Sequence, residues 1–175
     1  MDIQYIIDRA KGIILNPREE WQIIKEEQKS NRELLLYYAL PLVVLSVLTG
    51  FIGGISLNIA LYQLITPLLA LVIAAYVINE LAEKFNATKN LNNAFKLVVY
   101  AATPSLLATI IANLSFLLGW VSLFALYSIY LFWVGIVPMM DATRDKRLGY
   151  VIAVALIMII IQIALFLLLG SPMVV

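Results

Sequence analysis

The charged residues of this 175-residue chain are confined to three segments, and no other feature constrains its fold as strongly. The chain has 12 basic and 11 acidic residues, and all of them lie within residues 1–33, 80–96 and 141–147. The remaining uncharged runs hold 46, 44 and 28 residues and are Leu34–Asn79, Leu97–Met140 and Leu148–Val175. A helix needs about 20 apolar residues to cross the hydrocarbon core of a bilayer. The three runs therefore predict two, two and one membrane spans.

This pattern predicts an all-α, polytopic membrane protein with five transmembrane helices and an N-terminal amphipathic arm at the membrane interface. Residues 1–33 would form the cytoplasmic arm, residues 34–170 the five-span domain and residues 171–175 a short external tail. The composition agrees with this class, because 63% of the residues are hydrophobic and only 13% are charged. A soluble globular domain is much less apolar.

The basic residues predict the orientation of the spans. Five spans place the three charged segments on one side of the membrane, and that side carries all 12 Lys and Arg residues. Because Lys and Arg favour the cytoplasmic side, we expect the N-terminus inside and the C-terminus outside. Aromatic residues at the inner ends of the spans, such as Tyr38, Tyr100 and Tyr150, are expected to anchor at the head groups.

Several functional classes are disfavoured by residues that the chain lacks. It contains neither Cys nor His, which removes thiolate ligands and the commonest general base and metal ligand. The spans carry no carboxylate or basic side chain, the usual mark of ion-coupled transport. Acidic residues accompany the basic ones in each charged segment, so the sequence has no purely basic patch of the kind that indicates a nucleic-acid partner. We therefore expect a non-enzymatic protein without cofactor or metal, and we assign no catalytic or binding residue.

The N-terminal arm has the periodicity of two short amphipathic helices. Apolar residues at helical spacing predict a first helix over residues 3–14. Asn16 followed by Pro17 is typical of a second helix start, with Asn16 as the N-cap, and Trp21 and Ile24 give that helix an apolar stripe. Such an arm either lies on lipid in the interfacial plane or docks against the cytoplasmic end of the bundle, and periodicity alone does not separate the two.

The small polar residues inside the third span have two interpretations. Small polar residues recur every four positions in the third span, at Ala101, Ser105, Thr109 and Asn113. They could line a polar path, but close helix packing uses the same pattern, and we favour packing.

Prolines interrupt three spans, at Pro41, Pro67 and Pro104, and each removes a backbone donor. Thr66 and Thr103 precede two of these prolines and are expected to bond the freed backbone groups.

Three short motifs resemble those of a known family. The segment 16–25 resembles the "P-x-E-x-W-x-x-I" opening of prokaryotic proteins with a Yip domain, named after Ypt-interacting proteins. The segment 100–105 resembles the family's "Y-x-x-x-P" motif, and Tyr127 to Gly135 resembles its "Y-S-x-Y-x-x-x-x-G" motif. With five spans and a cytoplasmic N-terminus, the resemblance covers about residues 16–170.

The resemblance implies a fold and a location more than an activity. Eukaryotic relatives bind small GTPases of the Rab type and affect membrane shape, but their "D-L-x-G-P" segment has no counterpart here, so GTPase binding is carried over to no residue. The prokaryotic branch implies the cytoplasmic membrane. We expect a membrane-organising or partner-scaffolding role; the alternative is a passive conduit for lipids or small solutes. The expected partner is the lipid bilayer, while a protein partner at the cytoplasmic face and a homo-oligomer both stay open.

Overall fold

The computed structural model describes residues 3–169, and this part of the chain is all-helical. Five of its segments are long and apolar enough to cross a membrane, which confirms the expected five-span fold; they are Asn31–Ile52, Leu57–Phe85, Leu91–Ala112, Phe116–Met140 and Arg144–Leu167. The predicted tail, residues 171–175, lies outside the described residues.

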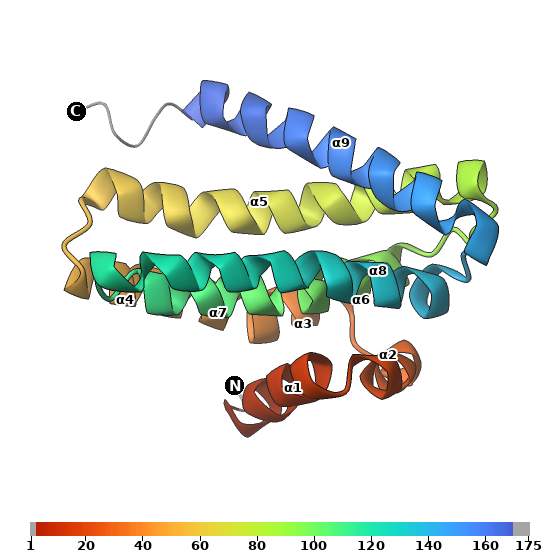
Figure 1. The fold of residues 1–175 in the computed structure, drawn as a ribbon, viewed down its shortest axis with the longest axis horizontal. Helices are drawn as coiled ribbons and strands as arrows, with labels where there is room; N and C mark the ends of the chain where they lie inside the picture. The colour runs from red at the N-terminus through yellow and green to blue at the C-terminus, as the bar shows by residue number, and fades with distance from the viewer. Residues whose placement is uncertain (1–2, 170–175) are drawn as a thin grey trace.

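The arm and the spans are built from the helices shown in Figure 1. The arm consists of α1 (Ile3–Leu15) and α2 (Pro17–Glu26). The first two spans are α3 (Asn31–Leu34) with the π-helical η1 (Leu35–Ala39) and α4 (Leu40–Ile52), and then α5 (Leu57–Leu81) with η2 (Ala82–Phe85). The other three are α6 (Leu91–Ala101) with α7 (Thr103–Ala112), then η3 (Phe116–Leu126) with α8 (Tyr127–Met140), and finally α9 (Arg144–Leu169).

The spans lie side by side along the long axis of the molecule, and the charged loops gather at one end of the bundle (Figure 1). We call this end, which carries η2 and the turn between α8 and α9, the charged end. The turns 53–56 and 113–115 lie at the opposite, uncharged end. The arm lies below the bundle in Figure 1 and α9 lies on its upper side, so the arm and α9 cover opposite flanks.

The third span forms the centre of the bundle. Leu97, Val99 and Tyr100 of α6 are completely buried, because α6 packs against both α5 and α8. Tyr38 and Tyr150 are also buried, so these tyrosines, like Tyr100, are core residues, and their predicted anchoring at the head groups is wrong. The Tyr38 hydroxyl lies 2.8 Å from Thr103 Oγ1, which satisfies both polar groups inside the core.

The polar side chains of the stripe in the third span form hydrogen bonds within the bundle. Ser105 Oγ donates to the Ala102 carbonyl at 2.7 Å, and Thr109 Oγ1 donates to the Ser105 carbonyl at 2.9 Å. Asn113 Nδ2 donates to the Ser46 carbonyl and to Gln63 Oε1, at 2.7 and 2.9 Å. Asn113 thereby joins three spans at the uncharged end.

The prolines interrupt the spans in different ways. Thr103 Oγ1 donates to the Tyr100 carbonyl at 2.7 Å, which confirms its expected role before Pro104. The same expectation is wrong for Thr66, whose buried hydroxyl has no hydrogen-bond partner within the described residues. The π-helix η1 ends just before α4, which carries Pro41 in its first turn; a wider turn of this kind accommodates a missing backbone bond.

Candidate functional site

The N-terminal arm docks on the flank of the bundle through its apolar stripe. Trp21 and Ile24 of α2 are completely buried, as is Ile13 of α1. The Trp21 indole packs on Gly135 of α8: a Cβ atom built on this glycine would lie 2.6 Å from Trp21 Cζ2 and 2.8 Å from Leu97 Cδ1. Only a residue without a side chain leaves room for the indole, so Gly135 is part of the docking surface.

The first helix of the arm, α1, lies deeper along the bundle than the sequence suggested. The Tyr127 hydroxyl donates to the Ile14 carbonyl at 2.9 Å. Tyr127 is the first residue of α8, which ends 13 residues later at Met140, so the contact lies about 20 Å from the charged end at 1.5 Å per helical residue. The hydrocarbon core of a bilayer is about 30 Å thick.

The other end of α1 also lies well along the first span. Ile3 and Ile7 line an apolar recess of about 650 Å³ together with Leu45 of α4. Leu45 lies 12 residues after Glu33, the last charged residue before the span, or roughly 18 Å along it. The arm therefore lies along the flank of the spans. The sequence left open whether the arm lies in the interfacial plane or docks at the bundle end, and the observed placement is between these two.

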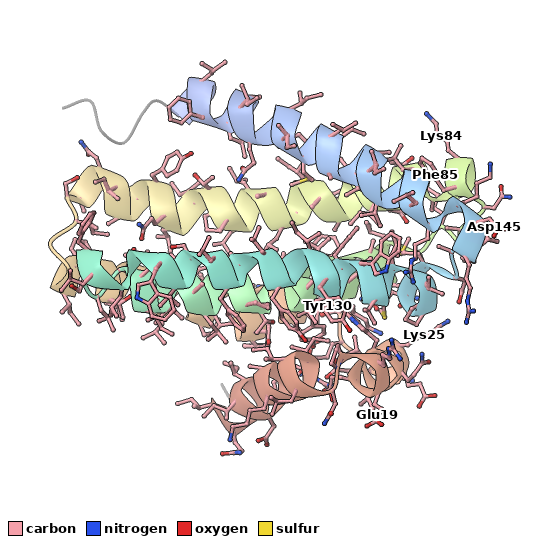
Figure 2. The ribbon with its side chains drawn as sticks, in the orientation of Figure 1. Glu19, Lys25, Lys84, Phe85, Tyr130 and Asp145 are labelled. Carbon is pink, nitrogen blue, oxygen red and sulfur yellow. The ribbon has the colours of Figure 1, made fainter. Side chains whose placement is uncertain are left out.

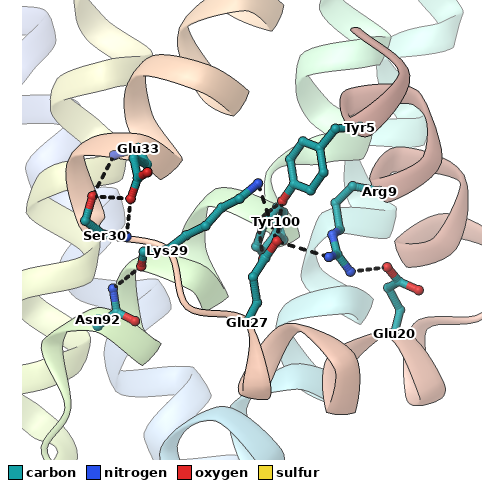
Figure 3. A network of polar contacts seen from close by, with 9 residues as sticks. All are labelled: Tyr5, Arg9, Glu20, Glu27, Lys29, Ser30, Glu33, Asn92 and Tyr100. Atoms are coloured by element: carbon teal, nitrogen blue, oxygen red, sulfur yellow. Dashed lines mark hydrogen bonds and ion pairs between the residues drawn. The ribbon is translucent and has the colours of Figure 1, made fainter. Parts of the chain in front are cut away.

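A network of charged and phenolic side chains fixes the arm in this position (Figure 3). Arg9 of α1 forms ion pairs with Glu20 of α2 and, at 3.2 Å, with Glu27. Tyr5 and Tyr100 each donate a hydrogen bond to Glu27, at 2.7 and 2.8 Å. We call these residues, together with Lys29, the arm network. It joins both arm helices to α6, the central helix of the bundle.

The arm network is largely removed from solvent. The side chains of Arg9, Glu27 and Glu20 are 10%, 13% and 14% exposed. Lys29 Nζ lies 3.4 Å from Glu27 Oε1 and 3.0 Å above the centre of the Tyr5 ring. Removing one partner of a buried ion pair costs about 3–5 kcal/mol, because the other charge is left uncompensated. Truncating Arg9 or Glu27 should therefore weaken docking more than any exposed charge of the arm.

The environment of Glu27 favours its charged form. Burial by itself would raise the pKa of the Glu27 carboxyl. The hydrogen bonds from Tyr5 and Tyr100, and the charges of Arg9 and Lys29, outweigh burial and hold this pKa below its ordinary value of 4.5. Glu27 is therefore an anion at neutral pH, as the ion pair with Arg9 requires.

The link between the arm and the first span is also held by hydrogen bonds. Ser30 and Glu33 form a capping box at the start of α3, and Asn92 Nδ2 donates to the Lys29 carbonyl at 2.8 Å. Lys96, which is 3% exposed, donates to the Lys25 carbonyl at 3.1 Å. The helix start predicted at Pro17 is confirmed, but Asn16 makes no side-chain capping bond, so its predicted capping role is wrong.

The three sequence motifs meet at the docked arm. Trp21 of the first motif packs on Gly135 of the third. Tyr100 of the second motif binds Glu27, and Tyr127, which opens the third, binds the Ile14 carbonyl. Each motif places at least one of these residues where the arm contacts a span. This contact gives the motifs a physical meaning that their spacing alone does not supply.

The chemistry of the arm network is that of a fixed structural joint. Its carboxylates are matched by guanidinium, ammonium and phenolic donors. Within residues 3–169, no three His, Cys, Asp or Glu side chains gather in a way that could hold a metal ion. The arrangement is suited to holding a charged arm against apolar spans.

Comparison with protein families matches residues 11–166 to the Yip1 domain. Because this match spans most of the chain, the chain belongs to the Yip1-domain family, as the motifs indicated. No curated protein and no solved structure matches the chain. The family establishes a multi-pass membrane protein in contact with the lipid bilayer, and the role of this member depends on its own geometry.

Proposed function

We propose that this Yip1-domain protein is a non-enzymatic, membrane-organising protein whose docked arm thins the leaflet beside it. The observation that carries the proposal is the level of α1, whose Ile14 carbonyl lies about 20 Å from the charged end of the bundle. The arm network fixes a helix with charged outer residues beside spans that are otherwise covered by lipid. The surrounding bilayer has to adapt to this helix.

The cost of the alternatives favours thinning. Asp8 and Lys11 lie on the exposed side of α1. A charged side chain surrounded by hydrocarbon at the centre of a span costs about 2.5–3.5 kcal/mol on insertion scales. Thinning the bilayer costs only fractions of a kcal/mol per Å of mismatch. Displacing the head groups by several Å toward the arm is therefore cheaper than surrounding two charges with acyl chains.

The proposal includes the orientation and location expected from the sequence. We place the arm and the charged loops on the cytoplasmic side of a prokaryotic cytoplasmic membrane, because all 12 Lys and Arg residues lie in the charged segments. In this orientation the leaflet that thins is the cytoplasmic one. The charged outer face of the arm is then also the surface that a protein partner would contact.

The test compares vesicles reconstituted with variants that differ only in docking. The double variant Arg9→Gln/Glu27→Gln removes the arm network without changing the net charge. The matched control, Glu80→Gln/Lys89→Gln, removes an exposed ion pair of 2.7 Å that includes no residue of the arm. Electron cryomicroscopy measures vesicle curvature and bilayer thickness. We expect smaller and thinner-walled vesicles with the unmodified protein and the control than with the double variant, and identical vesicles in all three would contradict the proposal.

The passive conduit has one observation in its favour. An apolar cavity of about 290 Å³ lies between α5, α6, α8 and α9, and Ser105 and Ser128 face it. The Ser105 hydroxyl already bonds the Ala102 carbonyl, and Ser128 Oγ accepts from the Ser105 amide, so the cavity suits a lipid tail better than a polar solute. Exposure of more than half of a reporter lipid to an external quencher, rising with protein and reduced by Ser105→Leu/Thr109→Leu, would favour this alternative.

A further inference from the structure

Three arginines that are distant in the sequence gather around one recess beside the arm. The recess has a volume of about 590 Å³. Arg18 of α2 lines it from the arm, and Arg144 and Arg147 line it from the start of α9. Between them lies α8, which contributes Tyr130 and Trp133. The recess therefore forms only when the arm is docked.

These arginines have no ion-pair partner in the part of the chain that the structure describes. The ion pairs found there use Arg9, Lys25, Lys29 and Lys89. The acids next to these arginines in the sequence, Glu19 and Asp145, do not line the recess. Figure 2 shows Glu19 on the outer side of α2 and Asp145 at the charged end. Three positive charges around one recess repel one another, so the recess is suited to an anion.

The start of α9 also favours an anion. The N-terminus of a helix carries a partial positive charge that favours acidic residues and disfavours basic ones. The first four residues of α9 nevertheless include Arg144, Lys146 and Arg147, against a single acid, Asp145. This arrangement opposes helix stability unless an anion binds there, in which case the helix end and the arginines favour the same ligand.

The shape of the recess indicates what kind of anion it takes. The Arg147 guanidinium lies 3.6 Å above the centre of the Trp133 ring, which holds it flat and leaves its N–H edge available for two parallel bonds to a phosphate. The wall along α8 is apolar and includes Val134 and Val137. A free phosphate would use only the arginines, whereas a phospholipid would use the arginines and the apolar wall.

We propose that this recess binds the phosphate head group of an anionic phospholipid, with an acyl chain along α8. The inference deepens the proposed function and rests on it for placing the recess at the head groups of the thinned leaflet. A bound lipid would bridge the arm to α9 and hold the head groups at the level of Arg18. The ligand class is a glycerophospholipid with a net negative charge.

The experiment measures lipid binding by the full chain. Protein purified in a neutral detergent is titrated with phosphatidylglycerol or phosphatidylcholine, and bound lipid is counted by native mass spectrometry. We expect phosphatidylglycerol to bind at least about tenfold more tightly. Both lipids offer a phosphate to the arginines, but only phosphatidylcholine also brings a cation among them, and like charges in contact disfavour binding by more than a factor of ten. Equal binding of the two lipids by the unmodified protein would overturn the proposal, and this comparison involves no variant that might misfold.

The variants locate the site. Arg18→Gln/Arg144→Gln/Arg147→Gln removes the three guanidinium groups. The matched control, Lys11→Gln/Arg32→Gln/Lys84→Gln, removes three other positive charges that do not line the recess. The proposal expects a loss of about tenfold or more in the first variant and none in the control. Equal losses in both would show unspecific attraction by net charge and would overturn the site.

A competition experiment distinguishes a bound lipid from a free anion. Displacement of phosphatidylglycerol by an equal concentration of inorganic phosphate would assign the recess to a free anion and overturn the lipid proposal. Failure of the proposed function would look different. In that case Arg9→Gln/Glu27→Gln would not change vesicle curvature or bilayer thickness, while the unmodified protein would still prefer phosphatidylglycerol. The two proposals can therefore fail independently.

Discussion

Replacing Gly135 by alanine should release the arm while leaving the bundle folded. The added Cβ atom would lie 2.6 Å from Trp21 Cζ2 and 2.8 Å from Leu97 Cδ1, and Trp21 is completely buried. Inserting a methyl group into a close-packed contact of this kind costs about 1–3 kcal/mol. Within α8 itself, alanine favours the helix over glycine by about 1 kcal/mol. The substitution therefore weakens docking while it strengthens the helix that carries it.

The consequence can be measured because the chain contains no native cysteine. Ile24 belongs to the arm and is completely buried where the arm docks on the bundle, so a cysteine at this position reacts with a maleimide only when the arm opens. A docking loss of about 1–3 kcal/mol raises the open population, and hence the labelling rate, by roughly 5-fold to 150-fold. The rate is compared between Ile24→Cys and Ile24→Cys/Gly135→Ala.

A second glycine supplies the control for this experiment. A Cβ atom at Gly119 would meet no atom within 4 Å, so Ile24→Cys/Gly119→Ala should label at the rate of Ile24→Cys alone. An unchanged rate for Gly135→Ala would mean that Trp21 does not need the space above the glycine, and the proposed docking contact would then be wrong. A rise that is equal in both glycine variants would point to a general loosening of the protein.

Two more predictions concern pH and the spans. Because the folded-state pKa of Glu27 lies below 4.5, its contribution to docking is fully present above pH 4.5 and is lost as the pH falls through the lowered value. Trp21 emission, followed with the other two tryptophans replaced by phenylalanine, should stay constant above pH 4.5 and shift to the red below it. A shift near neutral pH would contradict the assignment. Asn113→Leu should lower the thermal unfolding temperature, because it removes two hydrogen bonds that join three spans. Thr66→Val should leave this temperature unchanged or raise it, since the buried Thr66 hydroxyl has no partner among the described residues. The opposite order of the two unfolding temperatures would be evidence against the packing described.

The spans could be predicted from the sequence because their signal is local. Uncharged runs of 46, 44 and 28 residues allow only a few arrangements in a bilayer, and proline at the start of a helix acts on its nearest neighbours. The roles of Thr66 and Thr103 show the limit of this approach. Both precede a proline, but only Thr103 bonds a backbone carbonyl. Pro104 stands at the start of α7, whereas Pro67 lies inside α5, and the two residues before these prolines do not show which case applies.

The docking of the arm could not be predicted because it depends on contacts between distant residues. Trp21 and Gly135 are 114 positions apart in the sequence, and neither residue type by itself specifies the other. The amphipathic periodicity of the arm showed that it had an apolar face, but not which surface that face would cover. The recurrence of Trp21, Tyr100 and Gly135 in three family-like motifs was the one available signal, and it gained meaning only when the structure brought them to the arm.

The recess formed by Arg18, Arg144 and Arg147 was missed for a related reason. In the sequence these residues belong to two charged segments, where basic and acidic residues are mixed and no patch stands out. Only the docked arm brings Arg18 to the start of α9. Sequence reasoning correctly identified the charged segments but could not show which of their charges pair with one another and which are left without a partner in the described structure.

Access of water and head groups to the docked arm can be tested with spin labels at two matched positions. Lys11 lies on the exposed side of α1 and Leu156, which is 56% exposed, lies on α9 on the opposite flank. Leu156 follows Arg144 by 12 residues, which places it roughly 18 Å from the charged end, a level similar to that of the Ile14 carbonyl at the end of α1.

The measurement is the collision rate of each nitroxide with a water-soluble nickel complex and with oxygen, in protein reconstituted into bilayers. If the leaflet is thinned beside the arm, a label at Lys11 collides with the nickel complex, while a label at Leu156 collides with oxygen and is protected from nickel. The distance between the two labels, measured in the same samples, must match the docked arm. Protection of both labels from nickel at that distance would show that hydrocarbon surrounds the arm and that the leaflet is not thinned.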